Sequence, residues 1–207
     1  MHLRFPSKKL VIYGHSKGGC DIALALIKYP ELQEHMYGVI TMQAPYNGSY
    51  MIDWVVNNPV DKAATKVVET LFAGEKAAYE DLAYPSRKAI REQYEFDGRK
   101  IPTVNMCTYG GFELKKENLD TINELAGLGS MRFCHDVIMK AVGTKNDGMV
   151  APADGRMPGA SLVYLENMYH TEPAMQMPGT EYKNGALSQA LLACLLEKIS
   201  REGTNTT

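Results

Sequence analysis

The sequence lacks the features that mark several whole classes of protein. No stretch approaches the roughly 18 consecutive apolar residues of a membrane-spanning helix, so we expect no membrane span. Charges form no block of one sign, and the formal net charge is only −2. Because phosphate binding requires a basic surface, we expect no nucleic-acid partner. No internal repeat or low-complexity segment is present either.

Cysteine is scarce, and its spacing fits neither a disulfide framework nor a metal site. There is no CxxC pair among Cys20, Cys107, Cys134 and Cys194. In a chain of this length, scattered cysteines are more often packed thiols, so we predict that they are free and buried. The sequence therefore implies no metal and no organic cofactor.

The start of the chain lacks the pattern of a secretion signal. Residues 1–9 contain basic residues, but no apolar segment follows them before a glycine turn. This pattern favours a cytoplasmic location without a signal peptide, and a mature secreted chain fits it as well. The length of 207 residues predicts a single domain, residues 1–207.

The first third of the chain has the rhythm of a strand–helix–strand unit. Residues 10–13 are a short, continuous apolar run, typical of a strand buried on both faces. Residues 20–27 predict a mostly apolar helix that ends before Pro30, and residues 39–42 predict a second strand. Such a unit predicts an α/β fold with a parallel sheet and a right-handed crossover.

The rest of the pattern alternates in the same way. It predicts helical structure at 61–94, a strand at 101–109, helices at 117–126 and 131–141, a strand at 161–166, a helix at 185–201 and a frayed tail at 202–207. The last helix carries an apolar residue at every fourth position from Leu187 to Ile199, which predicts an inward-facing stripe.

One short motif carries a specific chemistry. Residues 14–18 read Gly-His-Ser-Lys-Gly, a G-x-S-x-G match, between the predicted strand and helix where a nucleophile elbow requires it. Glycines two residues on either side of Ser16 leave room for a strained turn. We predict Ser16 as the nucleophile and the Lys17 N–H as an oxyanion donor at the helix N-terminus. A glycine-rich turn without catalysis is the alternative.

A serine hydroxyl needs a base, and the chain has five histidines. His170 lies on a loop after the last predicted strand, the place where the carboxyl ends of parallel strands meet, so we predict it as the base. The other four lie at the terminus, in the elbow, in a connection and in a predicted helix: His2, His15, His35 and His135.

The acid that orients the base should lie between the serine and the histidine in the chain. Asp147, in Asn-Asp-Gly-Met-Val, is favoured, although an Asp-Gly turn is common in any protein. Glu113 is a rival because it lies just past the strand predicted to end at residue 109, and Asp154 is a third possibility.

These motifs resemble the triad of bacterial lipases and related α/β-hydrolases. Residues 43–49, with Asp53 and Trp54, also resemble the T-P-H-x-G-S…A-D stretch of those lipases. Tyr46 stands where the usual histidine lies, and Asn47 where the usual arginine lies. The resemblance implies an α/β-hydrolase fold, a mostly parallel sheet flanked by helices. Some of these lipases use a structural calcium, for which no site is identified in this sequence.

The function that the resemblance implies is that of a serine esterase or lipase. Such an enzyme hydrolyses short to medium carboxylic esters through an acyl-enzyme, and its partner is a small-molecule ester. Cleavage of amides, lactones or thioesters by the same triad is one alternative. A catalytically weak or silent hydrolase fold that serves in binding is another.

Ser16 comes earlier in the chain than the family pattern predicts. We expect an N-terminally truncated fold without the first strands and without the loop that supplies the second oxyanion N–H. Residues 10–13 would then form an exposed apolar edge, which proteins seldom leave uncovered. A homodimer is the simplest cover, while rearranged local elements or a weakly active truncated product are alternatives.

A helical excursion separates the second and third predicted strands. Residues 50–98 have the position of a cap-like insertion over the acyl site. Apolar residues in this segment could line a pocket or belong to the core: Met51, Ile52, Trp54, Val55, Leu71 and Phe72.

Overall fold

The computed structural model describes residues 8–58, 60–71, 75–110, 122–174 and 183–204. Its centre is a four-stranded sheet in which every neighbouring pair is parallel, in the order β1-β2-β3-β4. The strands are β1 (Leu10–His15), β2 (Met36–Met42), β3 (Thr103–Tyr109) and β4 (Ser161–Glu166). The predicted parallel sheet is thus confirmed.

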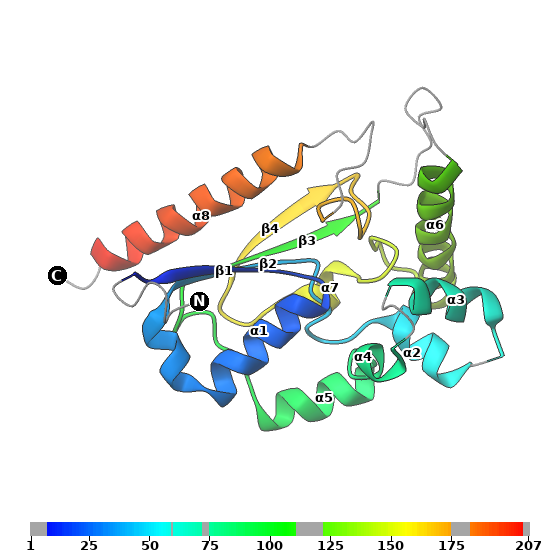
Figure 1. Cartoon of the computed structure of the whole chain (residues 1–207), viewed down its shortest axis with the longest axis horizontal. Helices are drawn as coiled ribbons and strands as arrows, with labels where there is room; N and C mark the ends of the chain where they lie inside the picture. The colour runs from blue at the N-terminus through cyan, green and yellow to red at the C-terminus, as the bar shows by residue number, and fades with distance from the viewer. Residues whose placement is uncertain (1–7, 59, 72–74, 111–121, 175–182, 205–207) are drawn as a thin grey trace.

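Helices cover both faces of this sheet, as Figure 1 shows, with α8 on one side and α1 and α5 on the other. No helix in the described part of the chain combines the length and apolar character that crossing a bilayer requires. The helices are α1 (Lys17–Lys28), the 3₁₀ helix η2 (Pro30–His35), α2 (Tyr50–Asn57), α3 (Lys62–Leu71), α4 (Lys76–Glu80), α5 (Tyr84–Gln93), α6 (Ile122–Val142), α7 (Pro152–Gly155) and α8 (Asn184–Thr204).

Helix α6 differs from the sequence prediction. Separate helices were expected at 117–126 and 131–141, but one helix runs from Ile122 to Val142, and residues 117–121 lie outside the described ranges. A glycine inside a helix costs only about 1 kcal/mol. Burial of Met131, Cys134 and Ile138 on the same helix offsets that cost.

The apolar stripe of α8 packs on the sheet as predicted. Leu191 and Leu195 are buried, and Leu187 and Ile199 are partly buried beside them. Each fully buried leucine contributes roughly 1.5–3 kcal/mol. The strand residues of the same cluster are Ile40, Met42, Val104 and Met106. Where a frayed tail was expected from residue 202, α8 continues to Thr204, and residues 205–207 lie outside the described part.

The segment between β2 and β3 contributes directly to the core on the opposite face. Met51, Ile52 and Val55 of α2 are buried in one cluster with residues of α1, which favours the core reading for these three. Trp54 is partly buried against that cluster. The side chain of Leu71 and the whole of Phe72 lie outside the described part.

The four cysteines are all free, but they do not share one environment. Cys20, Cys107 and Cys134 are buried as predicted, and burial raises the pKa of each thiol to about 12. The prediction was wrong for Cys194, which is exposed. It lies on α8, next in the chain to the buried Leu195.

The turn from β1 into α1 is strained and tightly packed. Ser16 has φ 53° and ψ −128°, a region that residues with a Cβ rarely adopt. A Cβ on Gly14 would lie 2.8 Å from the Gly19 nitrogen, and one on Gly19 would lie 2.7 Å from the Ala44 Cβ. A Cβ on Gly18 would meet nothing within 4 Å. The expected steric need for glycine therefore holds at position 14 but not at 18, and Gly19 is the second crowded position.

These contacts predict opposite effects for two neighbouring substitutions. Gly14→Ala should lower the free energy of unfolding by about 1–3 kcal/mol because its Cβ would overlap backbone. Gly18→Ala, the matched control, should leave stability unchanged or raise it by about 0.5–1 kcal/mol, since alanine is the better helix former. Urea denaturation of both variants measures the difference. Equal stability of the two would contradict the geometry.

Strand β1 forms one edge of the described sheet. It pairs with β2 on one side, and Val11 and Tyr13 are 39% and 38% exposed. The homodimer over this edge stays a prediction. Light scattering should then give twice the chain mass of 23.0 kDa. Val11→Lys should shift the protein to the monomer because charge on an edge opposes pairing, whereas Val60→Lys, at a residue 87% exposed, should not. A monomeric wild type would refute it.

Candidate active site

Three residues from distant parts of the chain meet at the carboxyl edge of the sheet. Ser16 follows β1, Asp147 lies between α6 and α7, and His170 lies on the loop after β4. The Ser16 Oγ is 2.8 Å from the His170 Nε2, and the His170 Nδ1 is 3.0 Å from the Asp147 Oδ2. His170 and Asp147 are buried, at 4% and 1% exposure. The structure thus places the three sequence-predicted residues in one hydrogen-bonded chain.

The hydrogen bonds of the Asp147 carboxylate fix the tautomer of His170. The Oδ1 accepts from the backbone nitrogens of Met149 and Val150 at 2.9 and 2.8 Å. The Oδ2 faces the His170 Nδ1 and the Thr108 hydroxyl, at 3.0 and 3.4 Å. A carboxylate surrounded by donors accepts from all of them, so the His170 Nδ1 carries a proton and its Nε2 is an acceptor. That nitrogen can receive the Ser16 proton.

The turn at Asp147 and Gly148 positions this carboxylate. Gly148 has φ 98°, and a Cβ there would lie 2.8 Å from the Met131 carbonyl oxygen. The Gly148 nitrogen donates to the Asn146 Oδ1 at 2.9 Å. The His170 nitrogen donates to the Asp147 carbonyl at 2.8 Å, which ties the two loops together. The turn interpretation and the acid interpretation of this motif are therefore compatible.

Of the two rival acids, Asp154 belongs to the described structure and is bound elsewhere. Glu113 lies outside the described residues. The Asp154 carboxylate accepts from the Tyr84 hydroxyl at 2.8 Å, and burial raises the pKa of Asp154.

His135, one of the histidines not chosen as the base, lies on α6, with its Nδ1 3.0 Å from the neighbouring Asp136 carboxylate.

Lys17 is the first residue of α1, where backbone N–H groups have no intrahelical acceptor. The Ser16 nitrogen is already bound to the Met42 carbonyl at 2.8 Å. The Lys17 side chain reaches Asp21 and Asp81, each at 2.8 Å. Burial alone would lower the pKa of Lys17, but these two hydrogen-bonded carboxylates outweigh it and raise the pKa. The oxyanion role of its N–H stays a prediction.

Sequence reasoning missed the polar residues behind His170. His15, which was expected to be committed to the elbow, lies with its Nε2 2.8 Å from the His170 carbonyl and 3.0 Å from the Gln43 Oε1. Gln43 and Thr108 lie at the ends of β2 and β3, and both are buried. Polar residues at the ends of apolar strands were the available signal.

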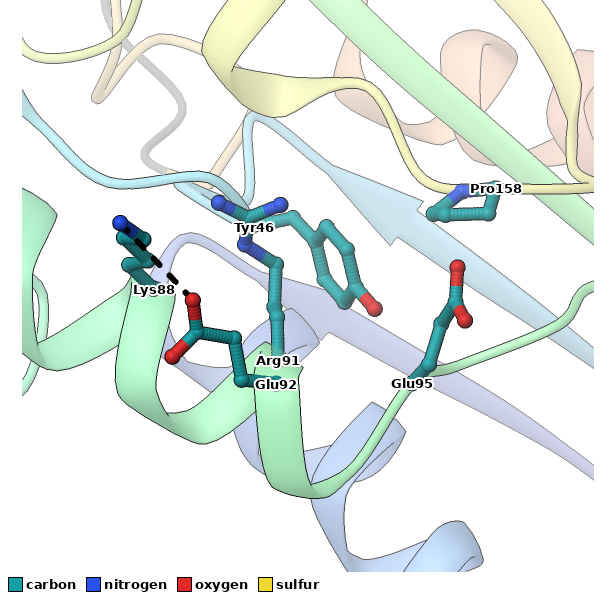
Figure 2. A pocket seen from close by; sticks show the side chains of 6 residues that line it. All are labelled: Tyr46, Lys88, Arg91, Glu92, Glu95 and Pro158. Atoms are coloured by element: carbon teal, nitrogen blue, oxygen red, sulfur yellow. Dashed lines mark ion pairs between the residues drawn. The ribbon is translucent and has the colours of Figure 1, made fainter.

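A separate cavity lies beside α5, and Ser16, Asp147 and His170 are not among the residues that line it. Figure 2 shows Tyr46 and Pro158 facing charged side chains of the α5 region, with an ion pair of 3.8 Å between Lys88 and Glu92. The cavity measures about 350 Å³, and its lining is Tyr46, Lys88, Arg91, Glu92, Glu95 and Pro158. Its formal charges cancel, and it contains no serine, cysteine or histidine nucleophile. Within the described ranges, no cluster of three or more His, Cys, Asp or Glu side chains could hold a metal ion.

The two residues that depart from the lipase pattern have structural contacts. The buried Tyr46 hydroxyl accepts from the Phe96 nitrogen at 3.0 Å, and the Arg87 guanidinium lies 5.7 Å from its ring centre. The Asn47 amide donates to the carbonyls of Ala153 and Arg156 at 3.1 and 3.2 Å. Both residues thus hold surrounding segments in place rather than contacting Ser16.

Known proteins resemble this chain in their three-dimensional structure but not in their sequence. No family model matches the chain, and no curated protein matches it. The mature form of the Bacillus licheniformis lipase BlEst2 matches with a TM-score of 0.68 at 19% identity, over 94% of this chain and 68% of that one.

Two further solved structures extend the likeness. The metagenomic carboxyl esterase MGS0156 matches with a TM-score of 0.58 at 19% identity, over 96% of this chain and 57% of that one. Staphylococcus hyicus lipase matches with a TM-score of 0.61 at 12% identity, over 95% of this chain and 71% of that one. The chain therefore spans about two thirds of these proteins, and it has the α/β-hydrolase fold that they share.

Proposed function

We propose that this protein is a serine hydrolase that cleaves carboxylic esters with Ser16 as nucleophile, His170 as base and Asp147 as orienting acid. The observation that carries the proposal is the chain of two hydrogen bonds, 2.8 Å from Ser16 to His170 and 3.0 Å from His170 to Asp147. Both distances lie in the range that nucleophile activation requires. The strained backbone of Ser16, between a strand and a helix, supports the proposal because a nucleophile elbow requires such a turn.

The proposed reaction transfers an acyl group in two steps. The His170 Nε2 takes the Ser16 proton while the Oγ attacks the ester carbonyl, and the Lys17 N–H stabilises the oxyanion. Asp147 stabilises the imidazolium that forms. His170 then gives its proton to the departing alcohol. Water, deprotonated by His170, attacks the acyl-enzyme and releases the acid, and Ser16 recovers its proton.

Esters are favoured over the other acyl substrates of such a triad. The names of the similar structures, lipases and a carboxyl esterase, support this choice. We propose short to medium acyl chains because Met51, Ile52 and Val55, which could have lined an acyl pocket, are packed in the core. A binding protein with weak or no catalytic activity is the second candidate. It is less favoured because Ser16 is hydrogen-bonded to His170, as a nucleophile would be.

We further propose that residues 50–98 form a cap over the acyl site. The support is the ion pair between Lys17, next to Ser16, and Asp81, between α4 and α5. It fastens this segment to the start of α1. The ion pair alone contributes little stability because both side chains are partly exposed, so the core residues of α2 supply most of the attachment.

We expect the wild type to hydrolyse p-nitrophenyl butyrate and Ser16→Ala to fall to background. Asp147→Asn should lower kcat by about 10⁴-fold because His170 would lose its oriented tautomer. Both variants keep the size of the native side chain, or reduce it by one atom, so the fold should persist. Rates of purified proteins, with circular dichroism as the folding control, measure this.

A fluorophosphonate probe separates an enzyme from a silent fold. It should label wild type at Ser16 and leave Ser16→Ala unlabelled. Equal hydrolysis by wild type and Ser16→Ala would refute the nucleophile. A folded wild type that neither hydrolyses the ester nor takes the label would make the binding protein the better candidate.

A further inference from the structure

Every strand of the sheet ends in a residue with left-handed backbone. Ser16 follows β1 with φ 53°, Gln43 follows β2 with φ 50°, and Asn167 follows β4 with φ 58°. Gly110, with φ 82°, follows β3. In the described ranges, the first three are the only residues other than glycine with positive φ. Such backbone persists only where the surroundings enforce it. Among the residues that follow β2, β3 and β4, Gln43 is the one whose buried side chain joins the hydrogen bonds behind His170.

The side chain of Gln43 is buried, at 1% exposure, and its amide has one possible orientation. The Nε2 donates to the Thr108 hydroxyl and, at 3.2 Å, to the Tyr169 carbonyl. Because a carbonyl only accepts, the amide nitrogen must face Tyr169 and the amide oxygen must face His15. The distance from the Gln43 Oε1 to the His15 Nε2 is 3.0 Å.

The protons of the neighbouring groups follow from this orientation. The Thr108 hydroxyl accepts from Gln43 and therefore turns its own proton toward the Asp147 Oδ2, 3.4 Å away. The His15 Nε2 lies 2.8 Å from the His170 carbonyl, so it carries a proton and donates. Burial, with the charge of His170 as the next cause, lowers the pKa of His15 to about 4. The ring is thus neutral at pH 7.

Gln43 is therefore connected both to the Tyr169–His170 backbone and, through Thr108, to Asp147. Through its own amide it holds the Tyr169 carbonyl, and its partner His15 holds the next carbonyl, that of His170. Through Thr108 it also reaches Asp147. Asp147 fixes the His170 ring and, through its carbonyl, the His170 nitrogen. His15 and Gln43 add to this by holding the carbonyls of His170 and Tyr169.

We propose that Gln43 is a positioning residue that sets the place of His170 and Asp147 relative to Ser16. The proposal rests on the proposed function. Gln43 acts through the Tyr169–His170 backbone and through Thr108, and it does not contact substrate. Loss of its amide should therefore impair proton transfer and leave ester binding largely intact.

His15 gives the same network a dependence on pH. Unfolded His15 binds its proton near pH 6.5 and folded His15 near pH 4, so the unfolded state holds more protons between these values. Stability should fall as pH drops through this window, by up to about 300-fold in the unfolding constant. The groups that face His15 are His170 and Asp147. Urea denaturation at pH 4 to 7 should show a shallower pH slope for His15→Gln, and identical slopes would contradict it.

The test of the proposal compares three variants with wild type. Gln43→Gly removes the amide and accepts φ 50° without strain, so a loss of activity cannot come from backbone strain at this position. Thr108→Val removes the hydroxyl that links Gln43 to Asp147, and it leaves the bonds of Gln43 to Tyr169 and His15 in place. Gln43→Glu keeps the shape but must be protonated to donate to Tyr169. Urea denaturation and circular dichroism check that each variant is folded.

The expected kinetics differ from those of a merely structural residue. Gln43→Gly should lower kcat by about 10–100-fold with KM within about twofold, since small misplacement of a base is costly. Thr108→Val should show a smaller loss. Gln43→Glu should gain an alkaline limb in the pH profile of kcat, because the ionised carboxylate cannot donate to the Tyr169 carbonyl. The titratable groups around it are His15, in direct contact, and Asp147, reached through Thr108. A folded Gln43→Gly with wild-type kcat and pH profile overturns the proposal.

A spectroscopic measurement separates failure of this proposal from failure of the proposed function. The proton between His170 and Asp147 should give a downfield NMR signal, assigned by its absence in His170→Gln. In Gln43→Gly the signal should broaden and exchange at least about tenfold faster as the pair loosens. An inactive wild type would defeat the proposed function, yet this signal would still test the positioning. An unchanged signal in Gln43→Gly overturns the positioning role.

Discussion

The parallel ladder of hydrogen bonds in the sheet is the constraint on which the site depends. Its register pairs His15 with Met42, Met42 with Met106, and Tyr109 with Glu166. The residues that follow β1 and β2 therefore lie side by side, and β3 and β4 run three residues further before they end together, although these segments come from distant parts of the chain. Parallel strands place all their carboxyl ends together, and this edge is where α/β folds place their ligands. A shift of one residue in any strand would turn its terminal side chain to the opposite face.

Strain and buried polarity are concentrated at that same edge. Left-handed residues other than glycine are costly, and the three in the described ranges follow β1, β2 and β4. The cost is offset because each buried polar atom in the network has a partner, and a fully satisfied network rigidifies what it connects. The Asp147 carboxylate, which faces four donors, is the best example. Strain here accompanies the placement of Ser16, His170 and Asp147 in one hydrogen-bonded chain.

The segments that resemble the lipase pattern and the two residues that depart from it lie in different parts of the structure. The turn at Ser16, the Asp-Gly turn and the loop of His170 all lie at the carboxyl edge. Tyr46 and Asn47 instead pack against the α5 region and the segment around α7, so these two departures lie in the structure that supports the candidate site. The cavity beside Tyr46, with its mixed charges, belongs to that supporting region (Figure 2).

The sequence by itself determined the features that arise from local patterns. Apolar runs predicted β1 and β2, and alternation predicted β4. Periodicity predicted the buried stripe of α8, and the motif around Ser16 predicted a strained turn between a strand and a helix. Local patterns failed where a distant contact outweighs a local preference. The glycines inside α6 do not divide it, and Gly19 rather than Gly18 is the crowded position because Ala44 packs against it.

Only the tertiary structure decided which side chains meet. Asp147 and His170 are 23 residues apart, and the sequence left Glu113 and Asp154 as rivals of Asp147. Gln43 and Thr108 carry no motif, because their importance comes from adjacency across strands and not from their neighbours in the chain. Hydrogen bonds between strand ends depend on register, and register is a property of the whole sheet.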